Sequence, residues 1–182
     1  MRRGRAVSAA RLARTGLVFA MGLLVACAGA RGPQPPAREP ALRLSELGAL
    51  GDPARRASMR LVLQGLDADV ARAPAAALAS YERALQVDPN NPWAWLALAR
   101  HELEQGQPAR ALAGLDKAEA LLPGEGELSR GAAPHRIGLR GAALHAARAS
   151  GATTQAPALL EDARRLAPVV WADGVLDASE LR

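Results

Sequence analysis

The chain has 182 residues, enough for one domain with a sizeable core but too few for two large ones. Hydrophobic residues make up 49% and charged residues 23%, a balance that excludes both global disorder and a protein with many membrane spans. Only 3% of the residues are aromatic, too few for a β-sandwich or a β-barrel of this size. Alanine supplies much of the apolar content, and it favours helices that pack closely. The composition therefore predicts an all-α protein.

The formal net charge of +5 comes entirely from the N-terminal residues 1–26, which contain five arginines and no acidic residue. Without these five arginines, the 23 basic residues of the chain are reduced to 18, which equals the number of acidic residues. A body without net charge offers no large electrostatic surface for a phosphate backbone. We therefore expect no binding of nucleic acid.

The N-terminus has the pattern of an export signal. The five arginines precede an uncharged apolar run of 11 residues, 16–26. A transmembrane helix needs about 20 apolar residues, whereas the hydrophobic region of a secretory signal needs about 7 to 15. The pattern predicts a signal peptide over residues 1–26. General secretion fits better than twin-arginine export, because the hydrophobic residues expected soon after Arg2 and Arg3 are absent.

The only cysteine of the chain follows this run, in the tetrapeptide Leu24-Val25-Ala26-Cys27. The tetrapeptide resembles the lipobox of bacterial lipoproteins, in which the cysteine becomes the first mature residue and carries lipid. The resemblance implies that Cys27 is lipidated, and two or three acyl chains would anchor the protein almost irreversibly. The alternative is a small buried free cysteine. In bacterial lipoproteins, a residue other than Asp after the cysteine, here Ala28, favours the outer membrane, so we expect an envelope protein anchored there and facing the periplasm.

The next residues, 28–40, are rich in Pro, Gly and Ala and lack apolar periodicity. With Cys27 they form a predicted tether over 27–40, with a reach of roughly 20 Å as a flexible coil. Apolar periodicity, prolines and capping residues then predict a series of helices. Their expected ranges are 41–49, the weakest, then 53–71, 75–87, 92–104, 108–121, 135–149 and 154–166.

The prolines that end two of these patterns, Pro89 and Pro123, are 34 residues apart, which is the tetratricopeptide period. Residues 92–125 resemble that repeat at the positions Trp95, Leu98, Ala99, Gly106, Ala111, Leu115, Ala118 and Pro123, with Glu102 where an aromatic residue is usual. Residues 58–91 resemble it at Leu61, Gly65, Ala68, Ala77, Tyr81, Ala84 and Pro89. A weaker third copy spans 137–170, with Ala143, Ala147, Gly151, Ala156, Leu160, Ala163 and Pro168.

The resemblance implies a tetratricopeptide-repeat (TPR) domain over 58–182, in which helical hairpins stack into a short right-handed solenoid. A lead-in with the weak helix covers 41–57, an insertion lies at 124–134, and a tail follows at 171–182. An irregular helical bundle is the alternative, because alanine-rich helices can imitate the spacing.

Catalytic chemistry has no candidate residues in the sequence. The three histidines, His101, His135 and His145, fall on different predicted helices, and His101 is expected on a helix surface. No zinc-protease helix, nucleophile elbow or nucleotide fingerprint is present. We therefore expect no enzyme, no metal and no cofactor.

The first helices of TPR hairpins line a concave face, so the resemblance implies a partner-binding groove there. Trp93 and Trp95 are about 200° apart on a helix, so if Trp95 is in the core, Trp93 faces outward. The alternative is that Trp93 packs against the preceding helix end. The implied groove positions are Met59, Val62, Leu66, Asp69, Val70, Trp93, Leu96, Arg100, Leu103, Glu104, Gly138, Gly141, His145, Arg148 and Ala149.

These observations lead to one main hypothesis: a lipid-anchored adaptor that binds another envelope protein, for example during assembly of a pilus, a secretion channel or an outer-membrane complex. One alternative is a lipid-anchored enzyme accessory or hydrolase with an unrecognised site. A second is a structural repeat protein that associates with itself into a homo-oligomer.

Overall fold

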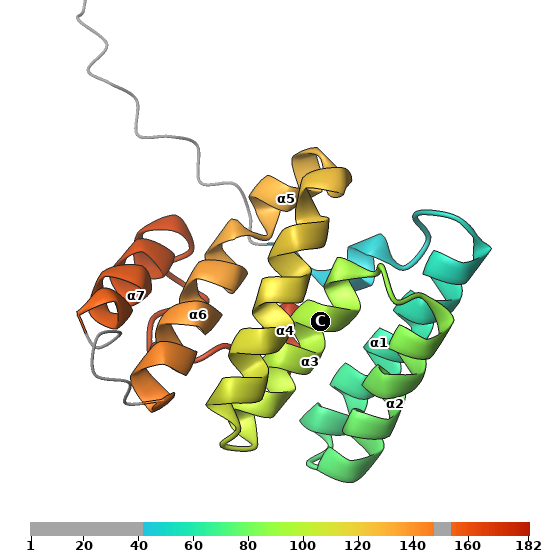
Figure 1. The fold of residues 1–182 in the computed structure, drawn as a ribbon, viewed down its shortest axis with the longest axis horizontal. Coiled ribbons are helices and arrows are strands. Elements are labelled where there is room, and N and C mark those ends of the chain that lie inside the picture. The colour runs from blue at the N-terminus through green and yellow to red at the C-terminus, as the bar shows by residue number, and fades with distance from the viewer. Residues whose placement is uncertain (1–41, 148–153) are drawn as a thin grey trace, which may run out of the picture. The chain divides into compact units, whose positions relative to one another are not determined.

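The computed structural model describes residues 42–147 and 154–182, and these are helical with no strand among them. The chain forms two units, residues 1–34 and 35–182, and the description below concerns the second (Figure 1). The predicted signal peptide, Cys27 and the tether lie outside the described residues, as do Arg148 and Ala149.

Helices lie where the sequence predicts them, with ends that differ by one or two residues. The weak helix expected over 41–49 is a single 3-10 turn, η1, and the expected insertion contains a second turn, η2, and the short helix α5. A further short helix, α8, lies in the tail, where none was expected. The elements are η1 Leu44–Leu47, α1 Pro53–Val70, α2 Pro74–Val87, α3 Pro92–Glu104, α4 Pro108–Leu121, η2 Leu122–Glu125, α5 Glu127–Gly131, α6 Ala133–Ala147, α7 Gln155–Leu166 and α8 Ala178–Leu181.

Local sequence explains where these helices begin and end. Helices α1 to α4 each begin with a proline, whose missing N–H would be unpaired at that position in any residue. Before α1, the Asp52 side chain accepts a hydrogen bond from the backbone N–H of Arg55 at 2.8 Å. Before α3, the Asn91 side chain caps Trp93 in the same way at 3.1 Å. Gly106 ends the turn after α3 at a φ of 73°, which glycine adopts without strain.

The long helices pair into hairpins, α1 with α2, α3 with α4, and α6 with α7, and neighbouring hairpins pack against each other (Figure 1). Small residues permit the close approach within a hairpin. A Cβ at Gly65 would lie only 2.4 Å from the Tyr81 ring, and one at Gly114 would lie 3.2 Å from Ala99. The prediction of an all-α protein built from stacked helical hairpins is confirmed.

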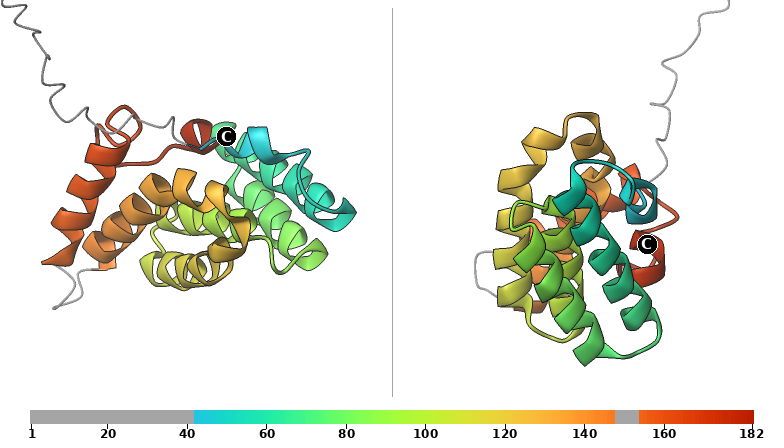
Figure 2. Two further views of the ribbon diagram at one scale, coloured as in Figure 1. Left: turned by 90° about the horizontal axis from the view of Figure 1, so that it is seen from above. Right: turned by 90° about the vertical axis from the view of Figure 1, so that its right-hand side faces the viewer.

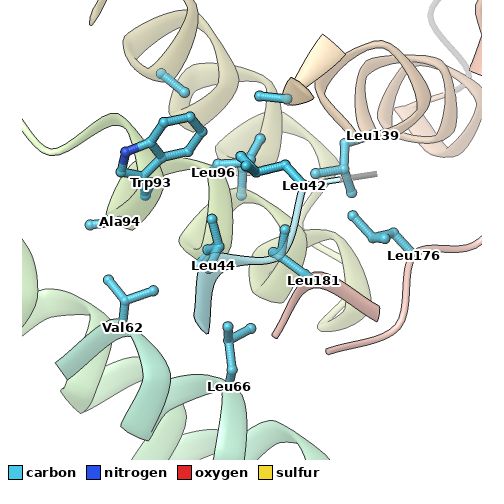
Figure 3. Close-up of a cluster of buried hydrophobic side chains, with 14 of the residues drawn as sticks. Leu42, Leu44, Val62, Leu66, Trp93, Ala94, Leu96, Leu139, Leu176 and Leu181 are labelled. Carbon is cyan, nitrogen blue, oxygen red and sulfur yellow. The ribbon is translucent and has the colours of Figure 1, made fainter. Parts of the chain in front are cut away.

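The first and last described segments lie together on one face of the hairpins (Figure 2). The backbone N–H of Ser45 donates to the carbonyl of Arg182 at 2.8 Å, and α8 packs against α1 and α3. Figure 3 shows Leu44 and Leu181 between Val62 and Leu66 of α1 and Leu96 of α3. The core of the described unit therefore includes residues from both terminal segments.

Candidate functional site

The face formed by α1, α3 and α6, where a groove was expected, is covered in this structure. Most of the expected groove residues are buried, namely Met59, Val62, Leu66, Asp69, Trp93, Leu96 and Arg100. Leu103 is half-buried, while Val70, Glu104 and His145 are exposed. The expectation of an open groove is therefore wrong for the buried residues, although the face itself lies on the helices that the repeat pattern indicated.

The cover consists of the two stretches predicted as lead-in and tail. Leu42, Leu44 and Leu47 of the first stretch are buried, and so are Leu176 and Leu181 of the second. Each buried leucine gains roughly 1.5 to 3 kcal/mol from removal of its side chain from water. The groove residues are buried because η1 packs on α1, and α8 packs on α1 and α3, so these leucines cover the apolar side chains of that face.

The N-terminal stretch is also held by a histidine from α6. His135 is fully buried, and its Nε2 lies 2.8 Å from the carbonyl oxygen of Leu42. Since a carbonyl only accepts, Nε2 carries the proton and donates. Burial lowers the pKa of His135, and the hydrogen bond to Leu42 offsets this only in part. The ring therefore stays neutral and fixes the backbone where the described chain begins.

Trp93 is more deeply buried than Trp95, whereas the sequence predicted Trp95 in the core and Trp93 facing outward. Trp93 is 2% exposed and lies near Leu47, Met59 and Leu128, which line a small cavity of about 40 Å³ with it. Trp95 is only partly buried, and its Nε1–H donates to the carbonyl of Pro89 at 2.9 Å. The physical reason is that η1 and α5 close over the side of α3 that bears Trp93.

The buried polar residues of this face converge on the carboxylate of Asp69. Tyr81 donates its hydroxyl to Oδ2 at 2.8 Å, and Arg100 contacts the same oxygen through Nη2. Nδ1 of His101 lies 2.8 Å from Oδ1 and donates to it, because a carboxylate only accepts. Arg100 also reaches Glu104 through Nη1 at 2.9 Å. The network joins α1, α2 and α3, and so ties the first two hairpins together.

The electrostatics of this network shift the pKa values of Asp69, Arg100 and Tyr81. Burial opposes the charge of Asp69, but His101, Arg100 and Tyr81 outweigh it and lower the pKa of Asp69 below its ordinary value. Burial also opposes the charge of Arg100, which Asp69 and Glu104 overcome, so the pKa of Arg100 is raised. Burial and the charge of Asp69 raise the pKa of Tyr81, which remains a donor.

This network corrects two expectations from the sequence. Arg100, expected as an exposed contact residue, has a side chain that is only 3% exposed. His101, expected on a helix surface, is buried beside the Tyr81 ring, with ring centroids 5.6 Å apart. A buried charge is costly unless it is paired, so the burial of Asp69, Arg100 and His101 depends on the contacts among them.

The expected groove positions on α6 are divided. Gly138 lies under the ring of Trp171, where a Cβ would be 2.2 Å from the nearest ring atom. Gly141 faces Leu159 and Leu160 of α7 and belongs to the hairpin interface, so its assignment to the groove is wrong. His145 is exposed near the end of α6, away from the polar network.

Two open pockets remain beside the C-terminal stretch. One, of about 610 Å³, is lined by residues that include Asp69, Arg72 and Glu104. The other, of about 220 Å³, is lined mainly by apolar residues, among them Leu103, Leu139 and Trp171. Asp177 lines both pockets, as does Glu104. The stretch is therefore flanked by open space along the face that it covers.

Fold and site together define a protein of stacked helical hairpins in which the face of α1 and α3 carries segments of its own chain. Residues 71–133, from the end of α1 to the start of α6, match the family model described as Tetratricopeptide repeat, which supports the TPR family for this part of the chain. Repeats of this family generally mediate protein–protein interaction. No curated protein and no solved structure matches the chain.

Two further observations concern the described residues only. No group of three His, Cys, Asp or Glu residues in this part of the chain could hold a metal ion. None of its helices combines the length and the apolar character that crossing a membrane requires.

Proposed function

We propose that this chain is a lipid-anchored adaptor that binds another protein on the periplasmic side of a bacterial envelope membrane. The arginine-rich and apolar pattern of residues 1–26, followed by Cys27, supports the anchor. The match of residues 71–133 to the TPR family supports the binding of a protein partner. We further propose the outer membrane as its location, and the assembly of a pilus, a secretion channel or an outer-membrane complex as its setting.

One observation carries the binding part of this proposal. The face of α1 and α3 already accommodates a polypeptide segment, through leucines that pack between the helices, while Asp69, Tyr81 and His101 bond to one another without that segment. A surface that holds a peptide of its own chain has the shape and the apolar character to hold one from another protein.

The anchor can be tested by replacing the only thiol of the chain. Cys27→Ser should abolish lipid attachment and move the protein from the membrane fraction to the soluble fraction, because a hydroxyl does not replace the thiol in this modification. Fractionation and mass measurement of the mature N-terminus give the two readouts. A Cys27→Ser protein that is still cut before position 27 and still sediments with membranes would show that the anchor lies elsewhere.

Partner binding can be tested with two matched charge reversals on the full-length protein. Glu104 is 52% exposed at the end of α3 and lines both pockets, whereas Glu161 is 74% exposed on α7. Each is paired with an arginine of its own helix. We expect Glu104→Lys to reduce capture of envelope proteins from detergent-solubilised membranes at least fivefold, and Glu161→Lys to leave capture unchanged. Equal capture by the two variants would place the interface away from the α1–α3 face.

A further inference from the structure

The last described stretch, residues 174–182 and here called the strap, lies on the hairpins in the manner of a bound peptide. Buried and exposed positions follow one another along it: Leu176, Ala178 and Leu181 are buried, while Asp177 and Ser179 are exposed. Leu181 lies near Leu66 and Leu96, and Leu176 lies near Leu139 (Figure 3). Two leucines five residues apart therefore anchor the strap.

Few polar contacts join the strap to the rest of the protein. The carboxylates of Asp177 and Glu180 form a capping box within the strap and bond to its own backbone. Gly174 and Val175 bond only to the adjacent Trp171 and Asp173. Among the described residues, the bonds from the strap to more distant segments involve Arg182, whose guanidinium pairs with Asp67 of α1 and whose carbonyl accepts from Ser45. The Arg182 and Asp67 side chains are each about half exposed, so this ion pair adds selectivity more than stability.

The surface beneath the strap is formed without it. Asp69, Tyr81, Arg100 and His101 contact one another from α1, α2 and α3, and the charge of Arg100 is paired with Asp69, so the removal of the strap would leave neither charge unpaired. The two pockets that strap residues line show that the strap leaves part of the face unfilled. A segment held by two leucine side chains, one surface ion pair and one backbone hydrogen bond can dissociate and leave the face of α1 and α3 intact.

We propose that the α1–α3 face is an exchangeable peptide site, and that its partner is a protein segment with two aliphatic residues five positions apart followed directly by a basic residue. This inference rests on the proposed adaptor function and specifies the partner. The aliphatic residues take the places of Leu176 and Leu181, and the basic residue pairs with Asp67 in place of Arg182. The strap is the chain's own copy of this pattern and covers the apolar face until a partner replaces it.

The strap competes with any partner at a high effective concentration, because only four residues separate Trp171 from Leu176. Short flexible connections give effective concentrations of about 1 mM. A free peptide should therefore bind the wild-type protein weakly, and should bind much more tightly once the strap is weakened. This difference makes the proposal measurable.

The first experiment uses full-length protein in detergent and a fluorescent, C-terminally amidated peptide with the sequence of residues 174–182. We expect the double variant Leu176→Ala, Leu181→Ala to bind the peptide at least tenfold more tightly than wild type, by fluorescence anisotropy. The matched control is Leu166→Ala, Val169→Ala, which removes two exposed aliphatic side chains outside the strap and should bind like wild type. Circular dichroism checks that each variant keeps its helices.

The second experiment reverses the charge of Asp67, an exposed residue that pairs with Arg182 of the strap, so it does not depend on the folding of the leucine variant. Asp67→Arg repels Arg182 and weakens the strap, and it should bind a peptide that ends in Glu in place of Arg182 at least fivefold more tightly than the original peptide. The leucine variant, which retains Asp67, should show the opposite order. A peptide with Asp in place of both leucines should bind neither variant.

Three results would overturn the inference. The first is a leucine variant that remains helical but does not bind the peptide, and the second is equal binding of the Arg- and Glu-ended peptides by both variants. The third is dimerisation of the leucine variant or of wild type through exchanged straps, detected by light scattering, which would make a second copy the occupant. Capture of envelope proteins without peptide binding would refute the inference and leave the adaptor function standing. Peptide binding without such capture would support the site and count against the adaptor.

Discussion

Replacement of Arg100 by alanine is expected to lower the free energy of unfolding by about 3 to 5 kcal/mol. The side chains of Arg100 and Asp69 are both almost completely buried, so the loss of the guanidinium leaves the carboxylate without its paired cation. Urea denaturation of the variant and of wild type measures the difference. Arg110→Ala is the matched control, because Arg110 is 70% exposed and its contact with Glu102 is 3.7 Å long. We expect that control to cost less than about 0.5 kcal/mol.

The same network should make the free energy of unfolding depend on pH. The folded protein lowers the pKa of Asp69 below its ordinary value of 3.8, so the carboxylate contributes stability above that value. The contribution disappears as the pH falls through the lower pKa of the folded state. Wild type should therefore lose stability below about pH 4 more steeply than Asp69→Asn, whose side chain does not titrate. The free energy of unfolding of both proteins is measured between about pH 2 and pH 7. If it falls equally with pH in both, or if Arg100→Ala lowers it only slightly, Asp69 and Arg100 are not paired in solution.

Replacement of Trp93 by alanine is expected to lower the free energy of unfolding by about 3 to 5 kcal/mol, as for a large side chain removed from a core. Trp93 is buried beside residues of α1, η1 and α5, whereas Trp95 is only partly buried. Trp95→Ala should therefore cost about 1 to 2 kcal/mol. Urea denaturation ranks the two variants. The reverse order would show that η1 does not cover Trp93 in solution, and that the α1–α3 face is open.

The sequence determined the helices and their pairing. A proline at the first position of α1, α2, α3 and α4 and side-chain caps at Asp52 and Asn91 are local signals, so they act whatever the rest of the fold does. The 34-residue spacing of Pro89 and Pro123 reports the hairpin period, because one hairpin is the structural unit that repeats. These signals require no knowledge of distant contacts, and the helices lie where they indicated.

The candidate site could be predicted only in part. The sequence indicated which helices form the face, since repeat position assigns α1 and α3 to it. It did not indicate that Trp93 and Arg100 are buried, because their burial depends on residues that are distant in the chain, such as Leu47 and Leu128 beside Trp93 and Asp69 beside Arg100. A usable signal was present in the closely spaced Leu42, Leu44 and Leu47, whose apolar side chains need a surface to pack against.

Asp69 illustrates the same limit for polar residues. Its partners Tyr81, Arg100 and His101 lie on two other helices, and no spacing rule within one helix links them. What the sequence determined by itself was the set of helices, their period and the export and lipidation pattern that leads to the proposed anchor. What only the tertiary structure decided was the occupant of the face, because burial of Leu44 and Leu181 between α1 and α3, and of Leu176 beside Leu139 of α6, results from contacts that form only when both ends of the described chain meet there.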